Sequence, residues 1–218
     1  MRLYLELSKN RQFVPFNYHS KLVGTVHKWL GENDFHDNLS LYSFSWLTGG
    51  IKSGNSLDFN SGAKWFISSP DHLFIRKILK GVTKENSVCF GMEVINVTIR
   101  ETPNFTDQNV FSVGSPVFIK RNVNDIQKFY NFHDEESGKY LTETLKTKLK
   151  KMNLNFENVT VEFDKEYLNP KIKGAEYNGI KNIGSICPII IDGSSEQKGF
   201  AWDVGVGNST GIGFGSLI

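Results

Sequence analysis

Apolar residues in the first hundred positions follow strand spacing and helix spacing in turn. Residues 3–7 carry leucine at every second position, which is typical of a half-buried strand. Residues 18–30 carry apolar side chains at helical spacing, and Gly31 suits the end of that helix. Pro70 and Asp71 open a second helical pattern. The other apolar runs predict strands over residues 41–47, 64–68 and 88–99. The predicted order is β-α-β-β-α-β, that of a ferredoxin-like unit.

The second half follows the same order of elements without a visible sequence repeat. Leucines one helical turn apart predict a helix over residues 141–152, and Ser194 suits the cap of a short helix over 194–204. Strands are predicted over residues 117–121, 160–163, 171–176, 183–191 and 212–218. The patterns therefore predict an α+β protein with two tandem ferredoxin-like (RRM-like) βαββαβ domains, residues 1–104 and 105–218, with a C-terminal glycine-rich loop.

The glycine-rich loop spans residues 205–215. Glycine costs conformational entropy, so a cluster indicates positive φ angles or a close approach of another backbone. Such loops also expose N–H groups that bind phosphates. Here a strand is predicted to follow, whereas Rossmann and Walker loops each open a helix. The loop therefore belongs to neither of those two classes.

Composition and charge narrow the choice of partners and compartment. The 218 residues are 39% hydrophobic and 22% charged, which is ordinary for a globular chain. A net charge of +2 means that a nucleic-acid site must arise from local patches. Cys89 and Cys187 fit neither a metal motif nor a disulfide framework, so we expect buried free thiols. The start alternates like a strand and no apolar run is long enough to span a membrane, so we expect a cytoplasmic protein.

Three stretches carry a resemblance to a known family. They are VPFNY with LVGTVHKWL (residues 14–18 and 22–30), HD with LYSFS (36–37 and 41–45), and FAWDVGVG with STGIGFG (200–207 and 209–215). The chain resembles the CRISPR-associated endoribonucleases that cut precursor CRISPR RNA within its repeats, in the repeat-associated mysterious protein superfamily. The third stretch is the most specific, and the middle of the chain adds no motif.

Two histidines have the chemistry that metal-free RNA cleavage needs. His27 lies off the apolar stripe of the first predicted helix, on the same face as Gly24. His36 lies in a polar loop that could bend back toward it. One imidazole would remove the 2′-hydroxyl proton and the other would protonate the departing 5′-oxygen, because a pKa of about 6.5 suits either task. From the residues alone, a solvated helix histidine and a hydrogen-bonding loop histidine remain alternatives.

The resemblance implies roles for these residues. The family places a histidine in the loop after the first helix, which corresponds to His36, and a tyrosine or histidine on that helix, which corresponds to His27. Some members add a lysine beyond the loop histidine, but residues 38–41 contain none. Ser40 or Ser43 would then donate a neutral hydrogen bond to the transition state. Other candidates, which would supply the positive charge of the missing lysine, are Lys21, Lys28 and Lys52.

Basic residues and glycines are the expected RNA contacts. Lys28 and the hairpin lysines Lys171, Lys173 and Lys181 are expected to bind phosphates, since the resemblance implies that the hairpin and the glycine-rich loop hold the repeat. The glycines expected at the RNA are Gly205, Gly207, Gly211 and Gly213. Gly213 and Gly215 also suit tight packing around Phe214. The lysines on the 141–152 helix, namely Lys146, Lys148, Lys150 and Lys151, are interpreted as a solvated face.

The sequence thus predicts an endoribonuclease that makes a 2′,3′-cyclic phosphate and a 5′-hydroxyl. No cluster of His, Asp, Glu and Cys has metal-ligand spacing, so we expect no metal and no cofactor. The expected partner is precursor CRISPR repeat RNA; other subunits of an effector complex and a homodimer remain open. The alternative is a CRISPR RNA-binding subunit that does not cut. An unrelated pair of ferredoxin-like units is a third hypothesis.

Overall fold

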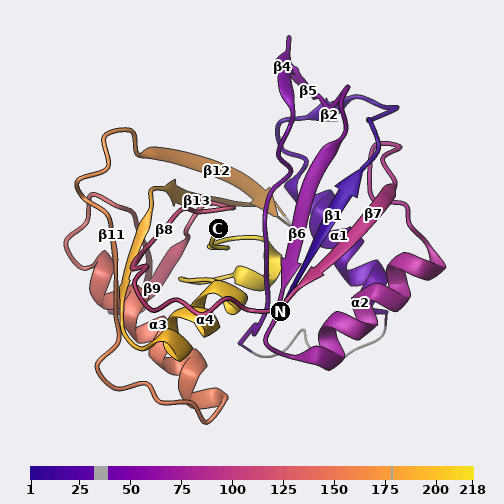
Figure 1. The fold of residues 1–218 in the computed structure, drawn as a ribbon. Coiled ribbons are helices and arrows are strands. Elements are labelled where there is room, and N and C mark those ends of the chain that lie inside the picture. Colours follow the sequence, from indigo (N-terminus) through magenta and orange to yellow (C-terminus); the bar gives the residue numbers. More distant parts are fainter. Residues whose placement is uncertain (32–38, 178) are drawn as a thin grey trace.

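A computed structural model describes residues 1–31, 39–177 and 179–218 of the chain. These ranges form an α+β fold with four α-helices and several antiparallel sheets. The N-terminal elements gather on one side of the molecule and the C-terminal elements on the other (Figure 1). None of the helices in the described ranges is long and apolar enough to cross a bilayer.

The N-terminal half is built on a four-stranded sheet. Its strands are β1 (Arg2–Leu7), β3 (Ser43–Phe44), β6 (Ala63–Ser68) and β7 (Val94–Arg100), in the order β3-β6-β1-β7. All neighbouring strands are antiparallel. In chain order, helix α1 (His19–Leu30) lies between β1 and β3, and helix α2 (His72–Lys84) lies between β6 and β7. This order confirms the βαββαβ arrangement predicted for the first half.

Both helix boundaries follow from local sequence signals. Gly31 has a φ of 65° and donates its N–H to the carbonyl of His27 at 3.0 Å, which confirms the predicted end of α1. The side chain of Asp71 accepts the N–H of Leu73 at 2.8 Å, which confirms the predicted start of α2. Short-range capping therefore sets these ends without help from distant residues.

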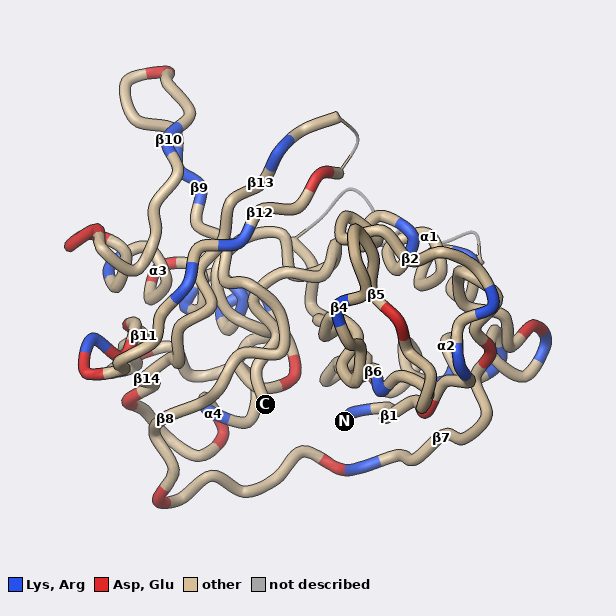
Figure 2. The backbone as a smooth tube through the Cα atoms, turned by 90° about the horizontal axis from the view of Figure 1, so that it is seen from above, with Lys and Arg blue, Asp and Glu red and all other residues tan. Residues whose placement is uncertain are grey.

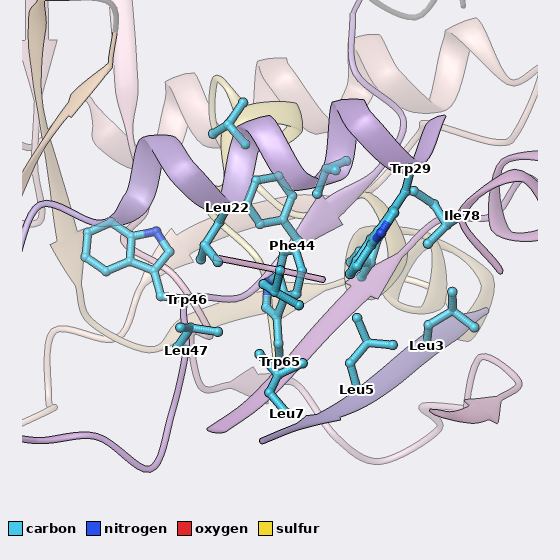
Figure 3. Packing of buried hydrophobic residues seen from close by; sticks show 14 of the residues in the cluster. Leu3, Leu5, Leu7, Leu22, Trp29, Phe44, Trp46, Leu47, Trp65 and Ile78 are labelled. Atoms are coloured by element: carbon cyan, nitrogen blue, oxygen red, sulfur yellow. The ribbon is translucent and has the colours of Figure 1, made fainter. Parts of the chain in front are cut away.

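The N-terminal core lies between the sheet and the two helices. Leucines of β1 point to the same side of the sheet as Trp65 and pack below α1 (Figure 3). The rings of Trp29 and Trp65 lie 5.6 Å apart between centroids. A Cβ at Gly81 would lie 2.6 Å from the Trp29 Cβ, so glycine lets α2 approach α1 closely. A smaller sheet, in the order β2-β5-β4, adds strands β2 (Val14–Pro15), β4 (Ile51–Ser53) and β5 (Ser56–Asp58).

The C-terminal half has a second core. Its helices are α3 (Ser137–Lys151) and α4 (Ser195–Val204), and its three-stranded sheet has the order β11-β14-β8. The strands of that sheet are β8 (Val110–Phe111), β11 (Thr160–Phe163) and β14 (Ile189–Asp192). Two hairpins extend from it, β9 (Ile119–Val123) with β10 (Ile126–Tyr130) and β12 (Lys171–Tyr177) with β13 (Ile180–Ile186). Ser194 forms a capping box with Gln197, which confirms the predicted start of α4.

The predicted final strand over residues 212–218 is wrong. Residues Thr210–Ile212 form a 3-10 helix, η1, and Leu217 makes only an isolated bridge with Val113. Gly213 and Gly215 have φ values of 80° and 63°, which interrupt an extended backbone. Phe214 and Leu217 are buried without belonging to a strand, so the hydrophobicity of this segment misled the prediction.

Other strand boundaries also differ from the predictions. The 88–99 strand starts only at Val94, because Phe90 and Gly91 adopt positive φ. The 183–191 strand divides into β13 and β14 around Pro188, which has no N–H to donate. The 41–47 strand is reduced to Ser43–Phe44, and the 117–121 strand is displaced to Ile119–Val123, where it pairs with β10 in a separate hairpin.

Candidate active site

The glycine-rich loop folds back on itself between the two halves. The N–H of Val206 donates to the carbonyl of Gly215 at 2.8 Å, which brings the two ends of the loop together. Gly205 has a φ of 71°, and a Cβ there would lie 2.6 Å from that same carbonyl oxygen. Only glycine allows this approach, so the loop has an intramolecular reason for its composition.

The N-terminal half binds three successive carbonyls of this loop. The Tyr42 hydroxyl donates to Gly211 at 3.0 Å, and the Trp46 indole donates to Gly213 at 2.8 Å. Between them, Nε2 of His19 donates to the carbonyl of Ile212. These bonds fix the loop to α1 and to the residues on either side of β3.

His19 is a structural residue that the sequence did not single out. Its ring is buried against Trp46 and Phe214, with centroids 5.4 and 5.1 Å away. Because a carbonyl only accepts, Nε2 carries the proton. Burial lowers the pKa of His19, and the hydrogen bond to Ile212 opposes this only in part. The sequence around His19 does not indicate that its side chain bonds to the carbonyl of Ile212, because that partner lies in a distant part of the chain.

The C-terminal half fixes the loop through Lys148. Its ammonium donates to the carbonyls of Val204 and Gly205, at 3.1 and 3.3 Å, and to Oγ1 of Thr210 at 3.0 Å. The side chain is buried, and this desolvation lowers its pKa to about 7. The interpretation of Lys148 as part of a solvated face is therefore wrong.

Two of the predicted catalytic residues lie in the described ranges, His27 on α1 and Ser40 beside the loop. His27 is half-buried on α1, eight residues and about 12 Å along the axis from His19. Ser40 touches the loop, because a Cβ at Gly211 would lie 2.8 Å from the Cβ of Ser40. His36 lies outside the described residues. The structure thus brings Ser40 to the glycine-rich loop, and its catalytic role and those of His27 and His36 stay predictions.

Lys28, in the last turn of α1, is held by a carboxylate at the C-terminal end of α2. Its ammonium lies 2.8 Å from Oε1 of Glu85 and also donates to the carbonyl and hydroxyl of Ser87. These contacts with Lys28 lower the pKa of Glu85, with a further contribution from the Ser87 hydroxyl. RNA contact at Lys28 stays a prediction, and the structure adds that this lysine already has an ion-pair partner.

The hairpin lysines do not form one patch. Lys171 and Lys173 are two residues apart on β12 and share a face, whereas Lys181 pairs with Glu176 on the other face. The Lys173 ammonium lies 4.9 Å from the centroid of the Trp46 ring, a cation–π contact with the N-terminal half. Burial lowers the pKa of Lys173, and Lys171 lowers it further.

The remaining glycines of the loop also meet protein atoms. Gly207 has a φ of 72°, and a Cβ there would lie 2.6 Å from the carbonyl oxygen of Phe118. A Cβ at Gly213 would overlap the Phe44 ring. RNA contact at these glycines stays a prediction. Across the described part of the chain, no group of three or more His, Cys, Asp or Glu is placed to hold a metal ion.

Comparison with known proteins places this arrangement in a family. The family model described as "CRISPR associated protein Cas6, C-terminal" matches residues 100–217. No curated protein sequence matches the chain. A solved structure named "An RAMP protein binding different RNA substrates" has a TM-score of 0.85 at 21% identity, covering 100% of this chain and 99% of its own. The structure "CRISPR associated protein Cas6" has a TM-score of 0.82 at 20% identity, covering 100% of this chain and 98% of its own. The structure of a Cas6-related protein from Pyrococcus furiosus has a TM-score of 0.82 at 20% identity, covering 100% of this chain and 97% of its own.

Proposed function

The chain belongs to the Cas6 family of CRISPR-associated proteins, and we propose that it is an endoribonuclease that cleaves precursor CRISPR RNA within its repeats. The family model supports this proposal, since it matches more than half of the chain. The similar solved structures support the fold over the full length. The name of one of them refers to RNA substrates, which agrees with an RNA ligand here.

One observation carries the proposal: the three stretches of the family resemblance meet in space. His19, which lies between the two segments of the first stretch, donates to the carbonyl of Ile212 in the third. Tyr42, from the second stretch, binds Gly211 in the same loop. Segments up to 193 residues apart in the sequence therefore form one contiguous region. A region of this kind is what a shared RNA site requires.

The proposed reaction needs two proton transfers. The 2′-oxygen adjacent to the scissile phosphate attacks phosphorus after one histidine removes its proton, and the other histidine protonates the departing 5′-oxygen. The products are a 2′,3′-cyclic phosphate and a 5′-hydroxyl. His27 and His36 are the proposed pair, and Ser40 is the proposed hydrogen-bond donor to the transition state. Each proton-transfer group typically contributes about 10² to 10⁴ in rate.

Cleavage of repeat RNA in chelator tests the proposal. We expect the wild-type protein to cut its repeat RNA in EDTA and to leave a cyclic phosphate, detected because the 3′-terminal phosphate resists phosphatase until acid opens the ring. His36→Ala should abolish cleavage and preserve RNA binding. A mobility shift without cleavage by the wild type would instead identify a non-cutting RNA-binding subunit. Dependence on a divalent ion would contradict the metal-independent mechanism.

We also propose that the two halves are tandem ferredoxin-like domains, residues 1–104 and 105–218. The C-terminal sheet order β11-β14-β8, extended by the bridge between Val113 and Leu217, supports this. In this scheme the fourth strand of the second domain is reduced to a single bridge. The proposed RNA contacts are the predicted lysines and glycines, namely Lys28, Lys171, Lys173, Lys181, Gly205, Gly207, Gly211 and Gly213.

A further inference from the structure

The helical layer of the N-terminal half carries charge of one sign. Neither α1 nor α2 contains Asp or Glu. Their basic residues are Lys21, Lys28, Arg76, Lys77, Lys80 and Lys84. The whole chain has 25 Lys and Arg against 23 Asp and Glu, so this layer holds an unusual share of the positive charge. Figure 2 shows blue positions along both helices.

Two adjoining hollows cross this layer. One of about 550 Å³ runs along α1 and is lined by Lys21, Gly24 and Lys28, among others. The second, of about 340 Å³, lies between the ends of α1 and α2 and includes Lys28, Lys77, Lys80 and Lys84 in its lining. Because Lys28 lines both, we treat them as one feature, the helical groove. His27 lies one helical turn from Gly24, which lines the first hollow, and one turn from Gly31, which lines the second, so a proposed catalytic histidine lies close to the groove.

The charge of the second hollow is positive. Its charged lining residues are four lysines and Glu85. Glu85 is engaged by Lys28 at 2.8 Å, which balances its charge. Lys77, Lys80 and Lys84 are exposed at helical spacing and extend over about 10 Å of α2. A solvated helix face usually mixes both signs, whereas a row of one sign suits a polyanion.

Among the described residues that line the second hollow, no side chain other than Glu85 is suited to reading bases. Trp29, whose atoms line the second hollow, is buried, and its indole N–H donates to the carbonyl of Glu85. Lysine binds phosphate as a point charge and does not distinguish sequences. The groove therefore fits the sugar–phosphate backbone of RNA.

We propose that the helical groove is a track for the RNA backbone next to the cleavage site, with Lys77, Lys80 and Lys84 binding phosphates. This inference rests on the proposed function, because it takes the RNA substrate as given. It adds a contact surface on α2 that is separate from the β12–β13 hairpin and the glycine-rich loop. These lysines strengthen RNA binding at any sequence.

A triple substitution with a matched control tests the track. The test variant is Lys77→Gln with Lys80→Gln and Lys84→Gln, all exposed. The control removes three lysines of the other helical layer, with Lys139→Gln, Lys146→Gln and Lys150→Gln on α3, which also carries Glu143. The dissociation constant for a fluorescent repeat RNA is measured by anisotropy over a range of KCl concentrations, and circular dichroism verifies folding.

We expect the test variant to reduce the slope of log Kd against log salt by about 2, from three contacts of about 0.7 each. The control should leave the slope near the wild-type value. An unchanged slope in the test variant, or an equal loss in the control, would overturn the track. If the wild type cleaves the repeat and the test variant keeps the wild-type slope, only the track fails. If the wild type neither binds nor cleaves it, the proposed function fails and the track with it.

Discussion

Nε2 of His19 donates a hydrogen bond to the carbonyl of Ile212, 193 residues further along the chain. This bond joins α1, which carries His27, to the glycine-rich loop. The loop is held from the other side by Lys148. Its position relative to α1 therefore depends on buried polar side chains of both halves.

His19→Ala should destabilise the protein. It removes the donor to the partly buried carbonyl of Ile212 and the buried ring that packs on Phe214, and an unsatisfied buried group costs about 1–3 kcal/mol. Urea denaturation measures the loss in free energy of unfolding. His19→Gln, which keeps an N–H donor, should lose less. Equal losses in the two variants would show that the hydrogen bond contributes nothing.

Lys148 should make stability depend on pH in a defined direction. Its pKa is about 7 in the folded state and about 10.5 in the unfolded chain, so the unfolded state binds more protons between these values. The free energy of unfolding should therefore rise with pH over this window, by no more than about 5 kcal/mol. The comparison is with Lys148→Met, which lacks this titration. If the free energy of unfolding changed with pH in the same way in both proteins, the prediction would be contradicted.

Gly215→Ala should be strongly destabilising. The residue has a φ of 63°, and a Cβ there would lie against the carbonyl of Val206. We expect a loss of more than about 2 kcal/mol in thermal or urea unfolding. The matched control is Gly24→Ala, because nothing lies within 4 Å of a Cβ at that helical position. Gly24→Ala should gain about 0.5–1 kcal/mol from helix propensity, and a loss there would contradict the open surface around α1.

Lys171→Ala with Lys173→Ala should reduce the salt dependence of RNA binding. Loss of two phosphate contacts should lower the slope by about 1.4. The control is Lys139→Ala with Lys150→Ala on α3. Because Lys173 also packs on Trp46, the melting temperature of each variant is measured in parallel. A wild-type slope in a folded double variant would exclude these lysines from the RNA site.

Much of the site region could be predicted from the sequence, and part of it could not. The resemblance located α1, the segment around Ser40 and the glycine-rich loop. Their meeting through His19 and Tyr42 joins residues 193 and 169 positions apart, which no local pattern encodes. The hairpin lysines were recognised as a group, but strand register places Lys181 on the other face from Lys171 and Lys173.

The sequence by itself determined the elements whose signals are local. The leucines of β1 alternate toward one core, Gly31 ends α1, and Asp71 and Ser194 start their helices. These depend on side-chain periodicity and on hydrogen bonds between near neighbours.

The tertiary structure decided the rest. It turned the apolar end of the chain into η1 and a buried coil, and it buried Lys148 against the loop. The physical reason is that both outcomes depend on partners from distant elements. An apolar run requires burial but not strand geometry, and a lysine is buried only where carbonyls and hydroxyls meet its ammonium.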